Sequence, residues 1–122
     1  MELNDICIEV GKKYNIDSIG VFGSRARGDF EDHSDYDIFI IGNIDLNTEL
    51  RLEYDLEKKL DSEVDVIKIN NETDKIFLKN ILNEAIVFLD DNGVFNKTYR
   101  EVEKFFRENS DFIKLRERDL IG

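Results

Sequence analysis

Apolar residues follow two kinds of spacing along this chain, and the switches between them predict helices and strands in turn. Apolar residues three or four positions apart, as in Ile6, Val10 and Tyr14, are typical of one face of an amphipathic helix. Short continuous apolar runs, such as residues 38–41, are typical of buried strands. We therefore expect helices over residues 2–14, 46–60, 73–83 and about 95–106, and strands over residues 17–22, 36–41 and 63–69.

Three shorter segments carry local signals of their own. Ser24 is a residue type that can cap a short helix over residues 25–27. Residues 85–89 are either a short strand or the tail of the preceding helix, since periodicity alone does not distinguish the two. Residues 91–93, Asp-Asn-Gly, predict a turn ahead of the last helix.

The order of these elements predicts one α/β domain, with a small mixed sheet flanked by helices. A chain of 122 residues is long enough for one core but not for two. We expect residues 1–122 to form a single domain, in which residues 94–122 are a C-terminal helical extension. Residues 109–111 should interrupt that extension before a terminal piece that contains Phe112, Ile113 and Leu115.

Charge is distributed unevenly and limits the possible partners. The net charge of −11 arises within residues 29–74, which hold fifteen acidic and four basic residues. A chain this acidic is unsuited to an extended nucleic-acid surface, where basic residues must neutralise phosphates. The apolar runs are far shorter than the roughly 18 residues of a membrane span. Because Cys7 is the only cysteine, no internal disulfide can form, and we expect a cytoplasmic protein without a membrane partner.

The candidate chemistry begins with two aspartates at the start of an expected strand. Asp35 and Asp37 are two positions apart, so their side chains project from the same face. Two carboxylates held together repel each other, and one of them is driven towards protonation unless a cation lies nearby. A divalent metal ion removes that penalty, so both residues are candidate metal ligands.

Asp65 is the best third acid for the same site. It lies between Val64 and Val66 in the next expected strand, and an acid within an apolar strand is costly unless it is paired or bound to metal. If the two strands pair, the three carboxylates converge and could hold two metal ions about 4 Å apart. Asp65 would then be placed to orient or deprotonate an attacking hydroxyl.

A glycine-containing turn precedes these acids by ten residues. Gly23 lets the backbone approach a phosphate closely, and Ser24 adds a hydroxyl at the start of a helix. Arg27, with Arg25 as the alternative, could neutralise a triphosphate or a departing pyrophosphate. A phosphate-binding turn beside a two-carboxylate metal site is the arrangement that nucleotide transfer requires.

These motifs resemble a known group of enzymes. Gly23-Ser24, ten intervening residues, Asp35-Tyr36-Asp37 and then Asp65 are similar to the motifs of the DNA polymerase β-type nucleotidyltransferase superfamily. The Gly-Ser-Arg-Ala-Arg-Gly form and the small size resemble the minimal nucleotidyltransferase (MNT) antitoxins of HEPN/MNT toxin–antitoxin pairs. The resemblance covers roughly residues 15–90.

The resemblance implies a polymerase β-type fold and a division of roles. Asp35, Asp37 and Asp65 would be the catalytic, Mg²⁺-binding triad, and Gly23 and Ser24 would hold the phosphates of ATP. Family members of this type transfer AMP from ATP to a tyrosine of a cognate HEPN ribonuclease toxin and silence it. Nothing in the residues themselves selects adenine or names the acceptor.

Two other functions stay open at this point. One is a non-catalytic antitoxin that neutralises its toxin by binding alone, although the intact set of three acids argues against it. The other keeps the chemistry but transfers the nucleotide to a small-molecule or RNA hydroxyl. Transferases of small drugs usually carry an added substrate domain, and those of RNA usually carry a basic track. Neither feature is visible in this chain.

Overall fold

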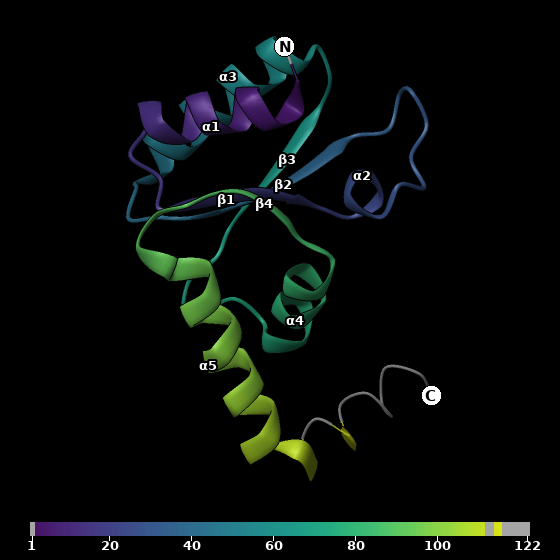
Figure 1. Ribbon diagram of the computed structural model, residues 1–122, viewed down its shortest axis with the longest axis vertical. Helices are drawn as coiled ribbons and strands as arrows, with labels where there is room; N and C mark the ends of the chain where they lie inside the picture. Colours follow the sequence, from purple (N-terminus) through teal and green to yellow (C-terminus); the bar gives the residue numbers. More distant parts are fainter. Residues whose placement is uncertain (1, 112–113, 116–122) are drawn as a thin grey trace.

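The computed structural model describes residues 2–111 and 114–115, and its elements follow the predicted order with one addition (Figure 1). The elements are α1 (Leu3–Lys13), β1 (Ser18–Phe22), α2 (Ser24–Arg27), β2 (Tyr36–Ile41), α3 (Leu46–Leu60), β3 (Val64–Lys68), α4 (Lys75–Glu84), β4 (Ile86–Asp90), the 3₁₀ turn η1 (Asp91–Gly93) and α5 (Val94–Glu108). The addition is β4, which settles the ambiguity of residues 85–89 in favour of a strand.

The four strands form one mixed sheet in the order β3-β2-β1-β4. β1 lies antiparallel to both β2 and β4, and β2 lies parallel to β3. The parallel pair is joined through α3, as parallel strands require a crossover connection. The predicted fold class, a small mixed sheet flanked by helices, is therefore confirmed.

Helices cover both faces of this sheet. In Figure 1, α1 and α3 lie on one side of the strands and α4 and α5 on the other. The alternation of side chains along β2 divides its residues between these layers. Ile38 and Ile40 pack in the cluster beneath α1 and α3, whereas Phe39 packs in the cluster beneath α4 and α5, with Ile41 against its edge.

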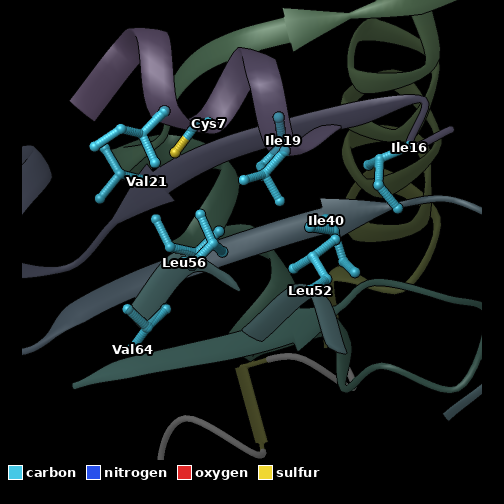
Figure 2. Packing of buried hydrophobic residues seen from close by; sticks show 11 residues of the cluster. Cys7, Ile16, Ile19, Val21, Ile40, Leu52, Leu56 and Val64 are labelled. Carbon is cyan, nitrogen blue, oxygen red and sulfur yellow. The ribbon is translucent and has the colours of Figure 1, made fainter. Parts of the chain in front are cut away.

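The layer of α1 and α3 contains the larger core. Figure 2 shows Cys7 of α1 with Leu52 and Leu56 of α3, facing strand residues such as Ile19 and Ile40. All five of these side chains are fully buried. Burial raises the pKa of the Cys7 thiol to about 12, so this cysteine is a core residue and is protonated at neutral pH.

Polar contacts tie α1 to α3 at the rim of that core. The Lys13 ammonium lies 2.8 Å from an Asp55 carboxylate oxygen, and the Tyr14 hydroxyl donates to the same oxygen. Lys59 reaches Glu9 at 3.3 Å. These contacts bridge two helices that are otherwise held together by apolar packing.

The layer of α4 and α5 is thinner. Val102 is the only residue of α5 classed as buried, and it packs with Leu78, Ile81 and Leu82 of α4. An open groove of about 310 Å³ runs between the two helices. The α4 helix begins where the Asp74 carboxylate accepts a hydrogen bond from Phe77 N–H at 3.0 Å. Asp74 therefore caps the N-terminus of this helix.

The C-terminal segment follows the prediction in part. The α5 helix ends at Glu108 with Asn109 at its C-cap position, but Ser110 and Asp111 are again helical, so the interruption expected over residues 109–111 is confined to Asn109. Phe112 and Ile113 of the expected terminal piece lie outside the described residues. No helix within the described ranges is long and apolar enough to cross a lipid bilayer.

Candidate functional site

The predicted acids meet at one end of the parallel strand pair. Asp37 is the second residue of β2, and the strand register places it directly beside Asp65 of β3. Neighbouring strand residues point to opposite faces, and Tyr36 and Val64 belong to the α1/α3 side. Asp37 and Asp65 therefore project from the α4 side of the sheet. Asp35, two residues ahead of Asp37, is close enough to act on it electrostatically.

Asp37 lies in an environment that disfavours its negative charge. Partial burial raises its pKa above the ordinary aspartate value, and the negative charges of Asp65 and Asp35 raise this pKa further. Arg27 acts in the opposite sense, and Glu84 adds a further upward contribution. Asp35 and Asp65 are exposed, so Asp37 is the inner member of the set. The charge of Arg27 does not offset the upward contributions, so the ionised form of Asp37 is disfavoured.

The turn after β1 lies directly against Asp37. Gly23 has a φ of +69°, a left-handed conformation that glycine adopts without strain. A Cβ atom at this position would collide with the Asp37 carboxylate and lie 3.2 Å from its Cγ. Only a glycine lets the backbone of the turn pass this close to the carboxylate. The structure thus brings the predicted phosphate-binding turn and the predicted metal ligands together.

The expected capping role of Ser24 is wrong. Gly23 stands at the N-cap position of α2, and Ser24 is the first helical residue. The reason is the extended, positive-φ conformation of Gly23, which supplies the non-helical residue that a cap position needs. Ser24 itself is half-buried, at the entrance to the turn.

Arg27, the arginine predicted to bind phosphate, is paired with two acids. Its Nη1 atom donates to Glu84 Oε1 at 3.0 Å, and its Nε atom donates to Asp29 Oδ2 at 3.2 Å. About half of its side chain is exposed. Because its charge lowers the pKa of Asp37, the guanidinium lies within electrostatic reach of the carboxylates.

Arg25 has a different role from the one considered in the sequence. Its guanidinium carbon lies 4.3 Å from the ring centre of Phe30 and 4.2 Å from that of Tyr36. Its Nη2 atom also donates to the carbonyl oxygen of Ser34 at 2.7 Å. Arg25 thus organises the loop between α2 and β2, and Arg27 is the arginine available to the site.

Glu84 is the residue that sequence reasoning missed. It is the last residue of α4, and its Oε2 atom accepts a hydrogen bond from Gly23 N–H at 3.0 Å. The two residues are 61 positions apart, so no local motif joins them. One signal was present: a negative charge in the last turn of a helix is disfavoured by the helix dipole. Glu84 is the only acid between residues 75 and 84.

The donor set fits a hard divalent cation. Carboxylate oxygens are the ligands that Mg²⁺ prefers, and a cation beside Asp37 would relieve the repulsion that raises its pKa. Among the described residues, no three His, Cys, Asp or Glu side chains are gathered closely enough to hold a metal ion by themselves. A cation beside Asp37 would therefore need further oxygen ligands. Mg²⁺ commonly retains water and takes substrate phosphates as its remaining ligands.

Comparison with known proteins places this geometry in context. The model of the family described as polymerase beta, nucleotidyltransferase matches residues 5–93. A protein of Methanocaldococcus jannaschii, whose name attributes protein adenylyltransferase activity to it, is 35% identical over 94 residues. That alignment covers 70% of this chain and 97% of the relative. The segment matched by the family model, residues 5–93, contains the turn, the three aspartates and Glu84.

Solved structures share the whole fold. One of a toxin–antitoxin with AMP-PNP has a TM-score of 0.82 at 15% identity and covers 99% of this chain and 100% of the other. Another, of a tri-AMPylated Shewanella oneidensis HEPN toxin in complex with an MNT antitoxin, has a TM-score of 0.74 at 14% identity. The match covers 98% of this chain and 96% of the other. At such identities the likeness establishes a common fold.

Proposed function

Because this chain belongs to the polymerase beta nucleotidyltransferase family, we propose that it is an antitoxin that transfers AMP from ATP to a tyrosine hydroxyl of a cognate HEPN ribonuclease toxin. The name of the M. jannaschii relative supports a protein as the acceptor. The toxin–antitoxin structures that share the fold support the partner. We place the reaction in the cytoplasm, with Mg²⁺ as the cofactor.

In this proposal the carboxylates bind the metal, and the turn binds the phosphates. Asp35, Asp37 and Asp65 hold the metal, with two ions as the expected number. Bound Mg²⁺ would supply the positive charge that stabilises the transferring phosphoryl group. Gly23 N–H, the Ser24 hydroxyl and the Arg27 guanidinium bind the phosphate oxygens of the nucleotide.

The reaction is a substitution at the α-phosphorus of ATP. The acceptor's phenolic oxygen forms a new bond to this phosphorus, and the bond to the β-phosphate oxygen breaks. Pyrophosphate leaves with the electron pair, and Arg27 stabilises its charge. Asp65 accepts the phenolic proton or orients the hydroxyl. As an exposed residue of the edge strand β3, Asp65 is reachable by a hydroxyl that belongs to another protein.

One observation carries this proposal. The register of β2 with β3 sets Asp37 beside Asp65, and the Gly23 turn packs against the same Asp37 carboxylate. Acids that served only as a solvated surface would not require a glycine turn in contact with them. We further propose that the C-terminal extension, residues 94–122, contributes to toxin binding. All of that extension lies beyond the family match, which ends at residue 93.

The decisive experiment uses the neighbouring gene product as the acceptor. The purified protein, that product, ATP and Mg²⁺ are incubated together, and intact mass is measured. We expect the partner to gain the mass of one or more AMP units, and we expect Asp35→Asn to abolish the gain while leaving the melting temperature within a few degrees.

Three results would contradict the proposal. Transfer at the wild-type rate by Asp35→Asn would remove Asp35 from the catalytic set. A stable complex without any mass gain, from any of the four nucleotides, would point to an antitoxin that acts by binding alone. Transfer to purified RNA without a protein acceptor would point to the third alternative.

A further inference from the structure

We propose that Glu84 is a placeholder for nucleotide phosphate: its carboxylate occupies the donors of Gly23 and Arg27 and must leave them when a triphosphate binds. This inference rests on the proposed function, because it takes Gly23 and Arg27 as phosphate donors. It adds a residue outside the aspartate motifs that sets nucleotide affinity.

The contacts of Glu84 are those expected of a phosphate. Oε2 accepts from Gly23 N–H at 3.0 Å, and Oε1 accepts from Arg27 Nη1 at 3.0 Å. One carboxylate thus links two donors: the backbone N–H at the start of the turn and the guanidinium at the end of α2. Two oxygens of a phosphate group would use the same pair of donors. Glu84 and a nucleotide cannot both hold them.

The position of Glu84 is otherwise unfavourable for an acid. It stands at the C-terminal end of α4, where the helix dipole repels negative charge. It also lies within electrostatic reach of Asp37, in a region that already contains Asp35 and Asp65. The hydrogen bonds from Gly23 N–H and Arg27 Nη1 therefore offset this repulsion. A phosphate that takes them would release Glu84 from an acidic neighbourhood.

A route for release is open. About one third of the Glu84 side chain is exposed, so rotation of the side chain can carry the carboxylate into water. Until then, its hydrogen bond satisfies the N–H of Gly23, a residue that is itself buried. A buried donor without a partner is costly. Glu84 therefore keeps the turn ordered before the nucleotide arrives, and weakens nucleotide binding by competition.

The test is the substitution Glu84→Gln, which keeps the shape and removes the charge. We expect it to lower the Kd for an ATP analogue that cannot be cleaved between the α- and β-phosphates by about tenfold, the order of one hydrogen bond to a charged group. Calorimetry is performed with Mg²⁺ and again with a chelator. In steady-state transfer, the KM for ATP should fall while kcat stays within about twofold.

Two control variants separate the placeholder from simpler effects. Glu72→Gln removes an exposed acid ahead of α4 and should leave Kd unchanged. Asp29→Asn frees one contact of Arg27 but leaves Gly23 N–H bound to Glu84, so it should tighten binding less than Glu84→Gln does. Melting curves check that each variant is folded.

The outcomes separate this inference from the function on which it rests. Unchanged or weaker binding by folded Glu84→Gln would overturn the placeholder, and so would an equal gain in Asp29→Asn. If the wild-type protein with Mg²⁺ binds no ATP analogue at all, the proposed function fails instead. If binding tightens as expected, the result supports both the placeholder role of Glu84 and the proposed function.

Discussion

The two faces of the sheet share the same strands but differ in how far they are buried and in the residues they bear. The α1/α3 face is closed by fully buried residues such as Leu52, Leu56 and Ile40. The α4/α5 face shares those strands, yet it bears Asp37 and Asp65 at one end and an open groove between its helices. The larger buried core lies on one side of the sheet, and the candidate site lies on the other.

The difference shows how a small protein can hold mutually repelling charges. Asp37 is flanked in sequence by Tyr36 and Ile38, both of which pack in or against the α1/α3 core. That packing holds the strand in place regardless of whether the charge on the other face is favourable. The acid can therefore stay poorly compensated until a cation arrives. Three experiments would break or sharpen this contrast.

The largest effect should follow from Asp37→Asn. We expect AMP transfer to fall by about a thousandfold or more, because the inner metal ligand is lost. The free energy of unfolding at neutral pH should not fall. A carboxyl with a raised folded-state pKa destabilises the fold above that pKa, and the fold gains stability as pH drops through it. Urea denaturation and the mass assay measure the two effects, and a large loss of stability would contradict the division between the faces.

A matched pair of leucines tests the two cores. Leu56→Ala, in the closed face, should lower the free energy of unfolding by about 4 kcal/mol. Leu82→Ala should lower it by about 2 kcal/mol, because Leu82 lines the open groove, where truncation leaves no enclosed cavity. Denaturant titrations of both variants give the comparison. Equal losses would mean that the two layers contribute alike.

The smallest effect concerns the rim of the closed face. Hydrogen bonds from Lys13 and Tyr14 hold the pKa of Asp55 below its ordinary value. Its contribution to stability is therefore present at neutral pH and lost as pH falls below about 4. Asp55→Asn should cost about 1 kcal/mol at pH 7 and less at pH 3. Asp32→Asn, in the exposed loop, is the control, and a pH-independent loss in Asp55→Asn would contradict the assignment.

The sequence predicted most of the fold because local pattern and final structure agree there. The strands at residues 17–22, 36–41 and 63–69 and the long helices are placed within a residue or two of those observed. The strand β4 stayed ambiguous because a five-residue apolar run fits a helix tail equally well. What decides it is pairing with β1, a contact across about 70 residues that no local pattern contains.

In the site, too, local sequence patterns predict some residues, whereas contacts between distant segments were not predictable. Strand alternation puts Asp37 on the α4 side of the sheet, and Asp35 lies just before β2, close enough to act on Asp37 electrostatically. It was also possible to propose Asp65, because an acid between two valines is conspicuous. The contacts of Glu84 were inaccessible, since they depend on where α4 ends relative to the turn after β1. The stacking of Arg25 on Phe30 and Tyr36 likewise depends on how the loop folds back.

The parallel register between β2 and β3 makes α3 a spacer as well as a cover for the core. Asp37 faces Asp65 because the fifteen residues of α3 and its two connections return the chain in step. A shift of one residue would turn Asp65 to the opposite face of the sheet. The length of this crossover therefore matters for the proposed catalytic role of Asp37 and Asp65. An insertion or deletion between residues 42 and 63 should damage AMP transfer even where the core tolerates it.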